Sequence, residues 1–370
     1  MKILLTGANG FIGKNLRVKI KESNINAYVL KKNSNLNKLK KKLLECDVVI
    51  HLAGVNRAKN KNDFVKVNFG YTKQIIDFFI KNKKKIHFVY ASSTQVKLDN
   101  PYGLSKKKTE IFLKNFAKDS NSTVSIYRMP IIFGKWAKKN HNSFIATACS
   151  SIINDKHLNV FDETKPIKLI YIDDLIDHIL KNLKVDFIKK QINYLNLSSI
   201  TYTSSIKKIL SKLKKFNNFK KTLKIENVGT KFNRALYSTF ISYYKKENFK
   251  EIISAKKDKR GSFLEIMKTR NSGQFSLITI KPNQTRGNHY HHSKTEKFLL
   301  IKGKVKFNFK NIDNNEGFSI IQTDKEYSLI NTVPGWSHNI KNLSKSESIL
   351  LIWVNEVFDF LKSDTIKADI

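Results

Sequence analysis

Short apolar runs separated by amphipathic stretches occupy the first half of the chain. Strand-like runs lie at Ile3–Leu5, 27–30, 47–54, 86–93 and 124–130, and helical patterns lie between most of them. This alternation is typical of a doubly wound parallel sheet, so it predicts an α/β fold of Rossmann type. A ligand is then expected at the carboxyl ends of the strands.

The pattern changes near residue 258, where period-two alternation and glycine turns replace most helix signals. Strand-like runs are SFLEIMK (262–268), FSLITI (275–280), KFLLI (297–301), KVKFNF (304–309) and SILLIWV (348–354). Lys302, Gly303 and Lys304 predict a hairpin between two of these runs. We therefore expect two domains, an α/β domain over residues 1–245 and an all-β barrel or sandwich over 246–370.

Composition fits two globular domains, because 370 residues with 41% apolar content can fill two cores. The net charge of +39 raises the alternative of a protein that binds nucleic acid or an anionic membrane surface. Only seven of the 69 basic residues are arginine, however, and phosphate and base recognition favours arginine. The lysines are also spread along most of the chain, so we interpret them as solvated surface residues and expect no nucleic-acid partner.

The two cysteines, Cys46 and Cys149, have no paired spacing, which fits a reducing compartment. No apolar run approaches the ~18 residues of a membrane span. The N-terminal MKILLTG enters a strand pattern directly and does not resemble a signal peptide. From these features we expect a cytoplasmic protein without a membrane span.

A glycine-rich turn follows the first predicted strand. Gly7, Gly10 and Gly13 recur every three residues, where they would permit a tight bend, close approach of a pyrophosphate, and packing of the helix on the strand. The second strand ends in Leu30, followed by Lys31 and Lys32. No acidic residue is there to bind a ribose 2′-hydroxyl, and lysine suits a 2′-phosphate, so the sequence favours NADPH.

A second candidate site lies in ASSTQVKLDNPYGLSK, residues 91–106. Tyr102 and Lys106 are four residues apart and therefore share one face of a helix. The ammonium, with a cationic nicotinamide nearby, would lower the pKa of the phenol and make Tyr102 a usable proton donor. Ser93 closes a predicted strand upstream, where its hydroxyl could hold a substrate carbonyl. In so lysine-rich a chain the Tyr–Lys spacing also arises by chance, and the neighbouring motifs argue against that alternative.

Together, TGANGFIG, HLAG, the Ser93 region and PYGLSK resemble the extended short-chain dehydrogenases/reductases that act on nucleotide sugars. The resemblance implies that Ser93, Tyr102 and Lys106 form a catalytic triad and that Asn68 supports the same site. It also implies that the turn after the first strand cradles the cofactor and that HLAG passes beneath it. The cofactor-binding residues expected on this basis are Gly7, Asn9, Gly10, Phe11, Ile12, Gly13, Lys31, Leu52, Ala53, Gly54, Asn68, Tyr102 and Lys106.

Three histidines and a glutamate mark the β-rich half. His289 and His291 point to the same side of an extended strand, Glu296 follows a turn, and His338 is expected on a neighbouring strand. Such a set suits zinc or another divalent transition metal. The spacing, with Gly303 after it, resembles the cupin pattern and implies a jelly-roll barrel. A histidine cluster without metal, or surface histidines, are the alternatives.

The same residues also resemble the sugar-nucleotide 3,5-epimerases, which are metal-independent cupins. DKRGSFLEI (258–266) and RGNHYH (286–291) carry this second resemblance. It implies that His289 is the catalytic base that removes a proton next to a ketone. His289 is therefore expected to be either a metal ligand or a base.

Over nearly its whole length the chain resembles the bifunctional enzymes of capsule and O-antigen synthesis. That resemblance implies C3 epimerisation of a UDP-linked 4-keto-6-deoxy amino sugar by a zinc-bearing cupin, then NADPH-dependent C4 reduction to UDP-2-acetamido-2,6-dideoxy-L-talose. A homodimer is expected. The alternatives are a reductase of another keto-sugar with a structural or dimerising cupin, and a polyanion-binding protein. A dehydratase is disfavoured because Thr94 and Gln95 follow Ser93 where dehydratases have an acidic pair.

Overall fold

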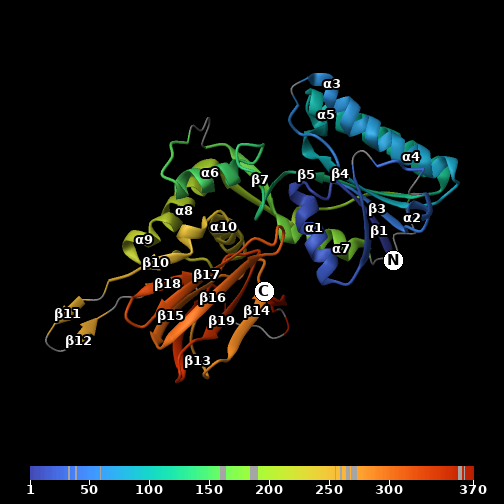
Figure 1. Ribbon diagram of the computed structural model, residues 1–370. Coiled ribbons are helices and arrows are strands. Elements are labelled where there is room, and N and C mark those ends of the chain that lie inside the picture. Colours follow the sequence, from blue (N-terminus) through green and yellow to red (C-terminus); the bar gives the residue numbers. More distant parts are fainter. Residues whose placement is uncertain are drawn as a thin grey trace. The chain divides into compact units, whose positions relative to one another are not determined.

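The computed structural model describes residues 1–31, 34–37, 40–58, 60–158, 164–183, 191–254, 256–258, 261–263, 267, 273–356, 361 and 363–370. It divides into two compact units (Figure 1). Unit 1 comprises Met1–Ser143 and Ile167–Thr203, and unit 2 comprises Phe144–Pro166 and Ser204–Ile370. Residues 144–166 and 204–245 of the expected first domain therefore belong to the same compact unit as the β-rich part. The expected domain boundary at residue 245 rests on motifs and stays a prediction.

Unit 1 is built on a six-stranded parallel sheet in the order β2-β1-β3-β4-β5-β8. The strands are β1 (Lys2–Thr6), β2 (Asn26–Leu30), β3 (Val48–His51), β4 (His87–Ser93), β5 (Thr123–Met129) and β8 (Ile192–Tyr194). The Rossmann-type prediction is confirmed. Five of the strands match predicted runs, whereas β8 lies in a lysine-rich region whose pattern indicated helix.

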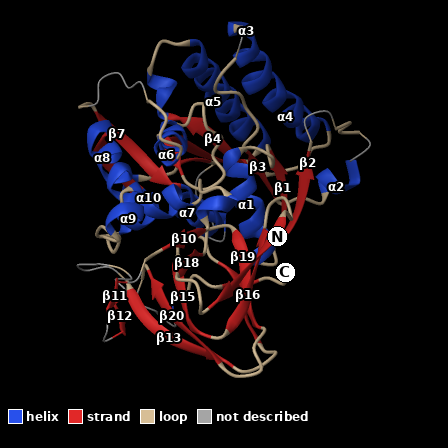
Figure 2. Ribbon diagram, turned by 60° about the vertical axis from the view of Figure 1, so that its left-hand side comes forward, coloured by secondary structure: helices blue, strands red, loops and turns tan. Residues whose placement is uncertain are grey.

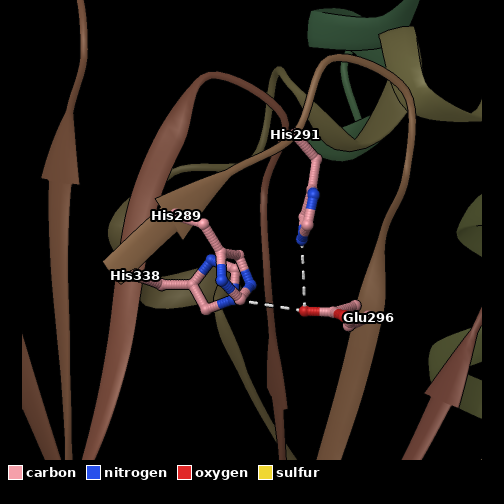
Figure 3. A group of neighbouring side chains, drawn as sticks. All are labelled: His289, His291, Glu296 and His338. Atoms are coloured by element: carbon pink, nitrogen blue, oxygen red, sulfur yellow. Dashed lines mark ion pairs between the residues drawn. The ribbon is translucent and has the colours of Figure 1, made fainter. Parts of the chain in front are cut away.

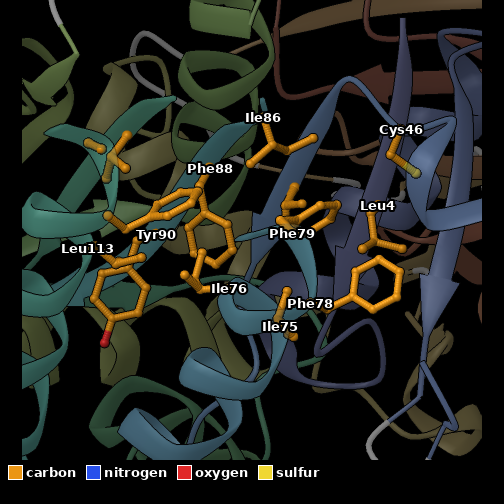
Figure 4. Packing of buried hydrophobic residues seen from close by; sticks show 14 of the residues in the cluster. Leu4, Cys46, Ile75, Ile76, Phe78, Phe79, Ile86, Phe88, Tyr90 and Leu113 are labelled. Carbon is orange, nitrogen blue, oxygen red and sulfur yellow. The ribbon is translucent and has the colours of Figure 1, made fainter. Parts of the chain in front are cut away.

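Helices cover both faces of this sheet (Figure 1). On one face α4 and α5 pack on the strands and form a core with residues such as Leu4, Phe79, Phe88 and Leu113 (Figure 4). On the other face α1 contacts α7. Burial of large apolar side chains, at roughly 1.5–3 kcal/mol each, holds the layers together. The helices are α1 (Phe11–Glu22), α2 (Lys40–Leu44), α3 (Lys61–Phe64), α4 (Tyr71–Lys81), α5 (Pro101–Ser120) and α7 (Ile172–Leu183), with the π-helical η1 (Val65–Gly70) and the 3-10 turns η2 (Thr94–Lys97) and η4 (Ser198–Ile200).

The strand order reverses direction at β1, with β2 on one side of it and β3 on the other. The connections after β1 and β3 therefore leave in opposite directions, which opens a crevice at the carboxyl ends of these strands. This crevice is where the sequence places the cofactor.

A smaller three-stranded sheet has the order β6-β7-β9 and comprises β6 (Ile131–Phe133), β7 (Pro166–Tyr171) and β9 (Thr201–Ser205).

Unit 2 contains two five-stranded sheets, in the orders β10-β18-β15-β20-β13 and β17-β16-β19-β14-β21. The pairings within both are antiparallel, and Phe298 of the first sheet contacts Phe307 of the second with ring centroids 5.7 Å apart. The predicted all-β cupin fold is confirmed. Its strands are β10 (Lys250–Ile252), β13 (Gln274–Ile280), β14 (Thr285–Tyr290), β15 (Glu296–Lys302), β16 (Lys304–Asn311), β17 (Gly317–Thr323), β18 (Ser328–Asn331), β19 (Trp336–Asn342), β20 (Ser348–Val354) and β21 (Ile366–Lys367), and a separate hairpin joins β11 (Lys256–Asp258) to β12 (Gly261–Phe263).

The hairpin predicted at Gly303 is wrong. β15 pairs with β18 and β20, whereas β16 pairs with β17 and β19 in the other sheet. Gly303, with φ +103, is therefore a corner at which the chain crosses from one sheet to the other. The local sequence of such a corner resembles a hairpin turn, because both require a glycine and flanking strands.

Helices of unit 2 pack against the strands (Figure 2). Lys297 Nζ of β15 lies 4.3 Å from the centroid of the Phe219 ring, and Arg234 forms an ion pair with Glu356 at 3.3 Å. The helices are α6 (Phe144–Ile153), α8 (Ile206–Asn217), α9 (Phe219–Thr222) and α10 (Lys231–Ile241), with the 3-10 turn η5 (Lys246–Asn248). Among the described residues, none of the helices has both the length and the apolar character needed to cross a bilayer.

Candidate active site and metal centre

The glycine turn after β1 lies against the loop after β3. Gly7 has φ +68, and a Cβ on it would lie 2.6 Å from Ala53 N. A Cβ on Gly13 would lie 2.1 Å from Gly7 O, so α1 can approach the turn only without that side chain. No side chain caps α1 at Gly10. The amide groups of its first turn are therefore suited to bind an anion such as a diphosphate.

The remaining predicted cofactor residues lie along the same edge of the sheet. Asn9 is exposed in the turn, and Phe11 and Ile12 begin α1. Lys31 is exposed directly after β2. Lys32 lies outside the described residues, so only one of the two predicted lysines has a defined place.

His51, the last residue of β3, is fully buried and neutral. Its Nδ1 lies 2.9 Å from Thr6 Oγ1, and its Nε2 lies 2.9 Å from Thr72 Oγ1. Thr72 donates its own hydroxyl hydrogen to Asn68 O, so it accepts from His51, and the ring proton is on Nε2. Nδ1 then accepts from Thr6, whose oxygen receives the Ala53 N–H. Burial lowers the pKa of His51 to about 3, and the ring ties β1 to the cofactor loop.

Asn68 lies buried in the π-helical turn η1, a type of irregularity that is frequent at functional sites. Its Oδ1 accepts from Val55 N at 2.8 Å, and its Nδ2 donates to Val55 O and to Ser105 Oγ, both at 3.0 Å. These bonds fasten the loop that begins with Leu52 and includes Gly54 to helix α5. Asn68 thus fixes the loop around Gly54 relative to helix α5.

Ser93, Tyr102 and Lys106 lie together beyond the carboxyl end of β4. Ser93 ends the strand, and its Oγ accepts from Gln95 N at 3.2 Å, which uses an oxygen lone pair and not the hydroxyl hydrogen. Its side chain also hydrogen-bonds Tyr102. Lys106 Nζ lies 6.0 Å from the centroid of the Tyr102 ring, on the same face of α5. The Ser93 and Tyr102 hydroxyls can therefore both donate to one carbonyl oxygen, with the Lys106 ammonium beside them.

Burial shifts the pKa values of both groups on α5. Burial lowers the pKa of Lys106 to about 8, with Glu110 opposing it, and Nζ donates to Ala91 O at 2.7 Å. Burial raises the pKa of Tyr102, and the bond with Ser93 only partly opposes that shift. In the chain without cofactor the pKa of this phenol is thus raised, whereas the sequence predicts a lowered pKa with a cationic nicotinamide nearby, and that prediction stands for the complex.

An ion pair between the partly exposed Arg128 and the buried Glu110 of α5 is absent from the sequence-based site. Arg128 of β5 binds the Glu110 carboxylate through Nε and Nη2, the latter at 2.6 Å. Ser92 Oγ donates to the same carboxylate at 2.6 Å. The pair attaches the helix that carries Lys106 to the two strands below it. No local pattern links Arg128 to Glu110, because the two residues are 18 positions apart in sequence.

The structure brings His289, His291, Glu296 and His338 together at one end of the barrel (Figure 3). One ligand atom from each lies within 4.8 Å of the others. His289 and His338 are paired directly across β14 and β19, and their ring centroids are 4.8 Å apart. Glu296 Oε2 lies 3.4 Å from His291 Nε2 and 3.2 Å from His338 Nε2. The predicted placement on one side of neighbouring strands is correct.

The donor set of this cluster fits a divalent transition metal. Burial opposes the charged form of Glu296, but His291 and His338 outweigh it and hold its pKa well below the usual range. Burial, together with His338 and His291, lowers the pKa of His289 to about 3. His291 Nε2 and Glu296 Oε2 are buried and have no hydrogen-bond partner in the part of the chain that the structure describes. A cation bound between these atoms would satisfy both.

Two further residues at this cluster were not predicted. Lys294 Nζ lies 3.8 Å from Glu296 Oε1, on the side away from the imidazoles. Asp364 accepts hydrogen bonds from the loop between His291 and Glu296. No local pattern marks either residue. Of the segment DKRGSFLEI, which carried the epimerase resemblance, residues 259–260 and 264–266 lie outside the described chain.

Two family models match the chain. The NAD dependent epimerase/dehydratase family matches residues 3–194, and the Polysaccharide biosynthesis C-terminal domain matches residues 256–366. The first match covers the glycine turn and the Ser93, Tyr102 and Lys106 group. The second covers the histidine and glutamate cluster.

Comparisons with individual proteins extend over the full length. The chain is 38% identical over 367 residues to the UDP-2-acetamido-2,6-β-L-arabino-hexul-4-ose reductase of Pseudomonas aeruginosa, covering 99% of this chain and 98% of that protein. The crystal structure of the capsular polysaccharide assembling protein CapF from Staphylococcus aureus is similar with a TM-score of 0.64 and 33% identity, covering 100% of both chains. The UDP-glucuronic acid 4-epimerase of Bacillus cereus in complex with NAD covers 59% of this chain and 83% of its own, with a TM-score of 0.51 and 24% identity, and shows the fold alone.

Proposed function

Since the chain belongs to the family of UDP-hexos-4-ulose reductases of polysaccharide synthesis that includes CapF, we propose that it performs two successive reactions on one nucleotide sugar. Unit 2 epimerises C3 of UDP-2-acetamido-2,6-dideoxy-4-hexulose, and unit 1 reduces C4 with NADPH to UDP-2-acetamido-2,6-dideoxy-L-talose. The grouping of Ser93, Tyr102 and Lys106 beyond β4, beside the glycine turn, carries the reductase half of the proposal.

In the reduction, the bound nicotinamide supplies a hydride to C4 of the sugar. Tyr102 donates its phenolic proton to the oxyanion that develops on the carbonyl oxygen. Ser93 donates a hydrogen bond to the same oxygen, which replaces the Tyr102 oxygen as the acceptor of the Ser93 hydroxyl hydrogen when substrate binds, since the Gln95 N–H occupies only a lone pair. The raised pKa of Tyr102 keeps this phenol protonated before the transfer.

Lys106 positions and stabilises the two groups around it. Its Nζ is held by Ala91 O and lies 4.8 Å from the centroid of the Tyr90 ring. With a pKa of about 8 the ammonium is mostly charged at neutral pH, so it stabilises the tyrosinate left after proton transfer. With the cofactor bound, the same ammonium would donate to its ribose.

For the epimerisation, a ketone at C4 acidifies the proton on C3. His289, His291, Glu296 and His338 would hold a divalent metal, which would polarise the ketone oxygen when bound. We propose His289 as a ligand because its ring faces His338 at 4.8 Å between the centroids and lies within the cluster. In the metal-independent alternative, His289 instead takes the C3 proton.

A homodimer is part of the proposal. β13 is an edge strand, and Phe275 and Leu277 on it are 43% and 62% exposed. Edge strands that expose apolar side chains are templates for pairing with another chain. Sedimentation velocity should therefore give a mass of twice 42.8 kDa.

Two variants test whether the reduction and the epimerisation occur at separate sites. Tyr102→Phe should reduce NADPH oxidation by roughly 10²–10⁴-fold, because the proton donor is lost, and leave deuterium incorporation at C3 unchanged. Tyr71→Phe is the matched control, since the Tyr71 hydroxyl has no hydrogen-bond partner among the described residues. Loss of both reactions in a folded Tyr102→Phe protein would refute separate sites.

His289→Ala decides between the two roles of this residue. As a ligand, His289 is required for metal retention, so the variant should lose both bound metal and C3 exchange. As a base, it is required only for exchange, and the variant should retain the metal. Metal analysis and ²H exchange on the same sample distinguish the two cases.

A further inference from the structure

The C-terminal segment of the chain, residues 363–368, lies along the strand that carries His289 and directly precedes His291. β21 pairs with β14, with Lys367 opposite His289 and Ile366 opposite Tyr290. Ala368 N donates to Asn288 O at 2.9 Å. These partners are 76 to 80 residues apart in sequence, so the tail is a strap added to the edge of the sheet beside the cluster.

The Asp364 carboxylate anchors this strap in the loop that follows His291. Oδ1 accepts from His292 N at 2.9 Å, and Oδ2 accepts from Ser293 N at 2.7 Å and Lys294 N at 2.8 Å. The Ser293 hydroxyl also donates to Oδ2, at 2.9 Å. Successive backbone N–H groups that converge on an anion form a rigid site, here filled by the chain's own carboxylate.

The main chain of Asp364 determines which nitrogen of His291 is available. Its carbonyl oxygen hydrogen-bonds His291 Nδ1. A carbonyl only accepts, so the hydrogen is on Nδ1, and the neutral ring keeps its lone pair on Nε2. That nitrogen faces Glu296 Oε2 at 3.4 Å. The strap therefore presents His291 in the tautomer and orientation that a metal ligand requires.

The strap also reaches the other oxygen of Glu296. Lys294 N is held by Asp364, and Lys294 Nζ donates to Thr365 Oγ1 at 2.8 Å. The same ammonium lies 3.8 Å from Glu296 Oε1, which leaves Oε2 facing the imidazoles. Asp364 thus orients His291, and Asp364 and Thr365 together hold Lys294 beside Glu296.

We propose that Asp364 is a positioning residue of the metal centre, through which the C-terminal strap sets the affinity of the cupin for a divalent transition metal. This inference rests on the proposed metal-dependent function of unit 2. Removal of a group that orients a ligating histidine costs about 10–100-fold in metal affinity. A strap that served only the fold would change stability and leave the affinity of the folded protein unaltered.

Full-length Asp364→Ala, compared with the wild type in a zinc competition titration against a chromophoric chelator, tests the proposal. We expect zinc binding to weaken 10–100-fold. In the Co²⁺-loaded protein at saturation, the d–d absorption should also change, because His291 is no longer oriented. Asp364→Asn, whose amide oxygen still accepts N–H bonds, should recover part of the affinity.

Asp369→Ala is the matched control, since Asp369 is an exposed aspartate of the same tail. It should bind zinc as the wild type does. Equal zinc affinity and an equal Co²⁺ spectrum in wild type and Asp364→Ala would overturn the inference alone. Failure of the wild type to bind zinc or cobalt, or binding that Glu296→Gln leaves intact, would instead overturn the proposed metal centre.

Discussion

The side chain of His51 shows how a buried residue can stabilise the proposed cofactor site without contacting cofactor or substrate. The imidazole is neutral, and both of its nitrogens are occupied by threonine hydroxyls. Its pKa of about 3 is far below the ordinary value of 6.5, because burial disfavours the charged ring. His87, with a pKa of about 4, behaves in the same way.

The stability of unit 1 should consequently fall in mild acid. Between pH 6.5 and the folded pKa values, the unfolded chain binds protons at His51 and His87 that the folded chain does not. The stabilisation is thus complete above pH 6.5 and is lost as pH falls, by up to about 1.4 kcal/mol per pH unit for each proton. Urea unfolding between pH 7.5 and 4.5 measures this slope.

His51→Gln should flatten that slope by about one proton. His141→Gln is the control, because His141 is exposed in the same unit. Equal slopes for wild type and His51→Gln would show that the ring is not held neutral.

Lys31 is the described residue on which the proposed preference for NADPH depends. Lys31→Asp should weaken kcat/KM with NADPH by about tenfold or more and favour NADH, because a carboxylate repels the 2′-phosphate and accepts from a 2′-hydroxyl. Lys85→Asp alters an exposed lysine at the opposite, amino end of β4 and should leave the ratio unchanged. An unchanged NADPH/NADH ratio in Lys31→Asp would remove the argument for NADPH.

The sequence predicted residues whose role depends on local spacing and missed those that depend on distant partners. Ser93, Tyr102 and Lys106 were predicted because a strand end and one helical turn suffice to group them. Asp364 was missed, since its partners are 70 to 72 residues away. The rise that burial causes in the pKa of Tyr102 was missed for a related reason, because burial depends on packing that no short motif specifies.

Among the helices and strands, α5 is the one whose first turn places Tyr102, a proposed catalytic residue. Asn100 caps this helix by accepting from Gly103 N at 2.8 Å, and Pro101 occupies its first position. Asn100→Ala should cost about 1 kcal/mol of stability. It should also lower kcat/KM for reduction several-fold, because Tyr102 lies in the frayed turn.

Asn60→Ala provides the comparison for this helix cap. Asn60 caps α3 by accepting from Asn62 N at 3.0 Å, and α3 carries none of the proposed catalytic residues. Its loss should lower stability without a comparable loss of kcat/KM. Thermal unfolding and steady-state kinetics of both variants test the distinction, and equal kinetic losses would contradict it.

The periodicity of a strand indicates that a strand exists and not which strand it pairs with. The runs around Gly303 were correctly predicted as strands, but their pairing was wrong because the two belong to different sheets. β8 was missed since it has only three residues, INY, and lies in a lysine-rich region. Parallel strands and sheet corners are both specified by contacts distant in sequence.

In the whole molecule, each of the two proposed reactions has its own compact unit. Residues of the proposed reductase site all lie in unit 1, and the histidine and glutamate cluster lies in unit 2. Removal of metal should therefore abolish the epimerisation while leaving NADPH binding intact.

The most direct test is C3 exchange by the wild-type protein. UDP-2-acetamido-2,6-dideoxy-4-hexulose is incubated with it in deuterated water without NADPH, and ²H at C3 is followed by NMR before and after chelation and zinc repletion. We expect exchange that stops on chelation, returns with zinc, and is followed by formation of the 4-hydroxy sugar once NADPH is added. Exchange that persists in verified metal-free protein, or its absence from metal-loaded protein, would contradict the central claim.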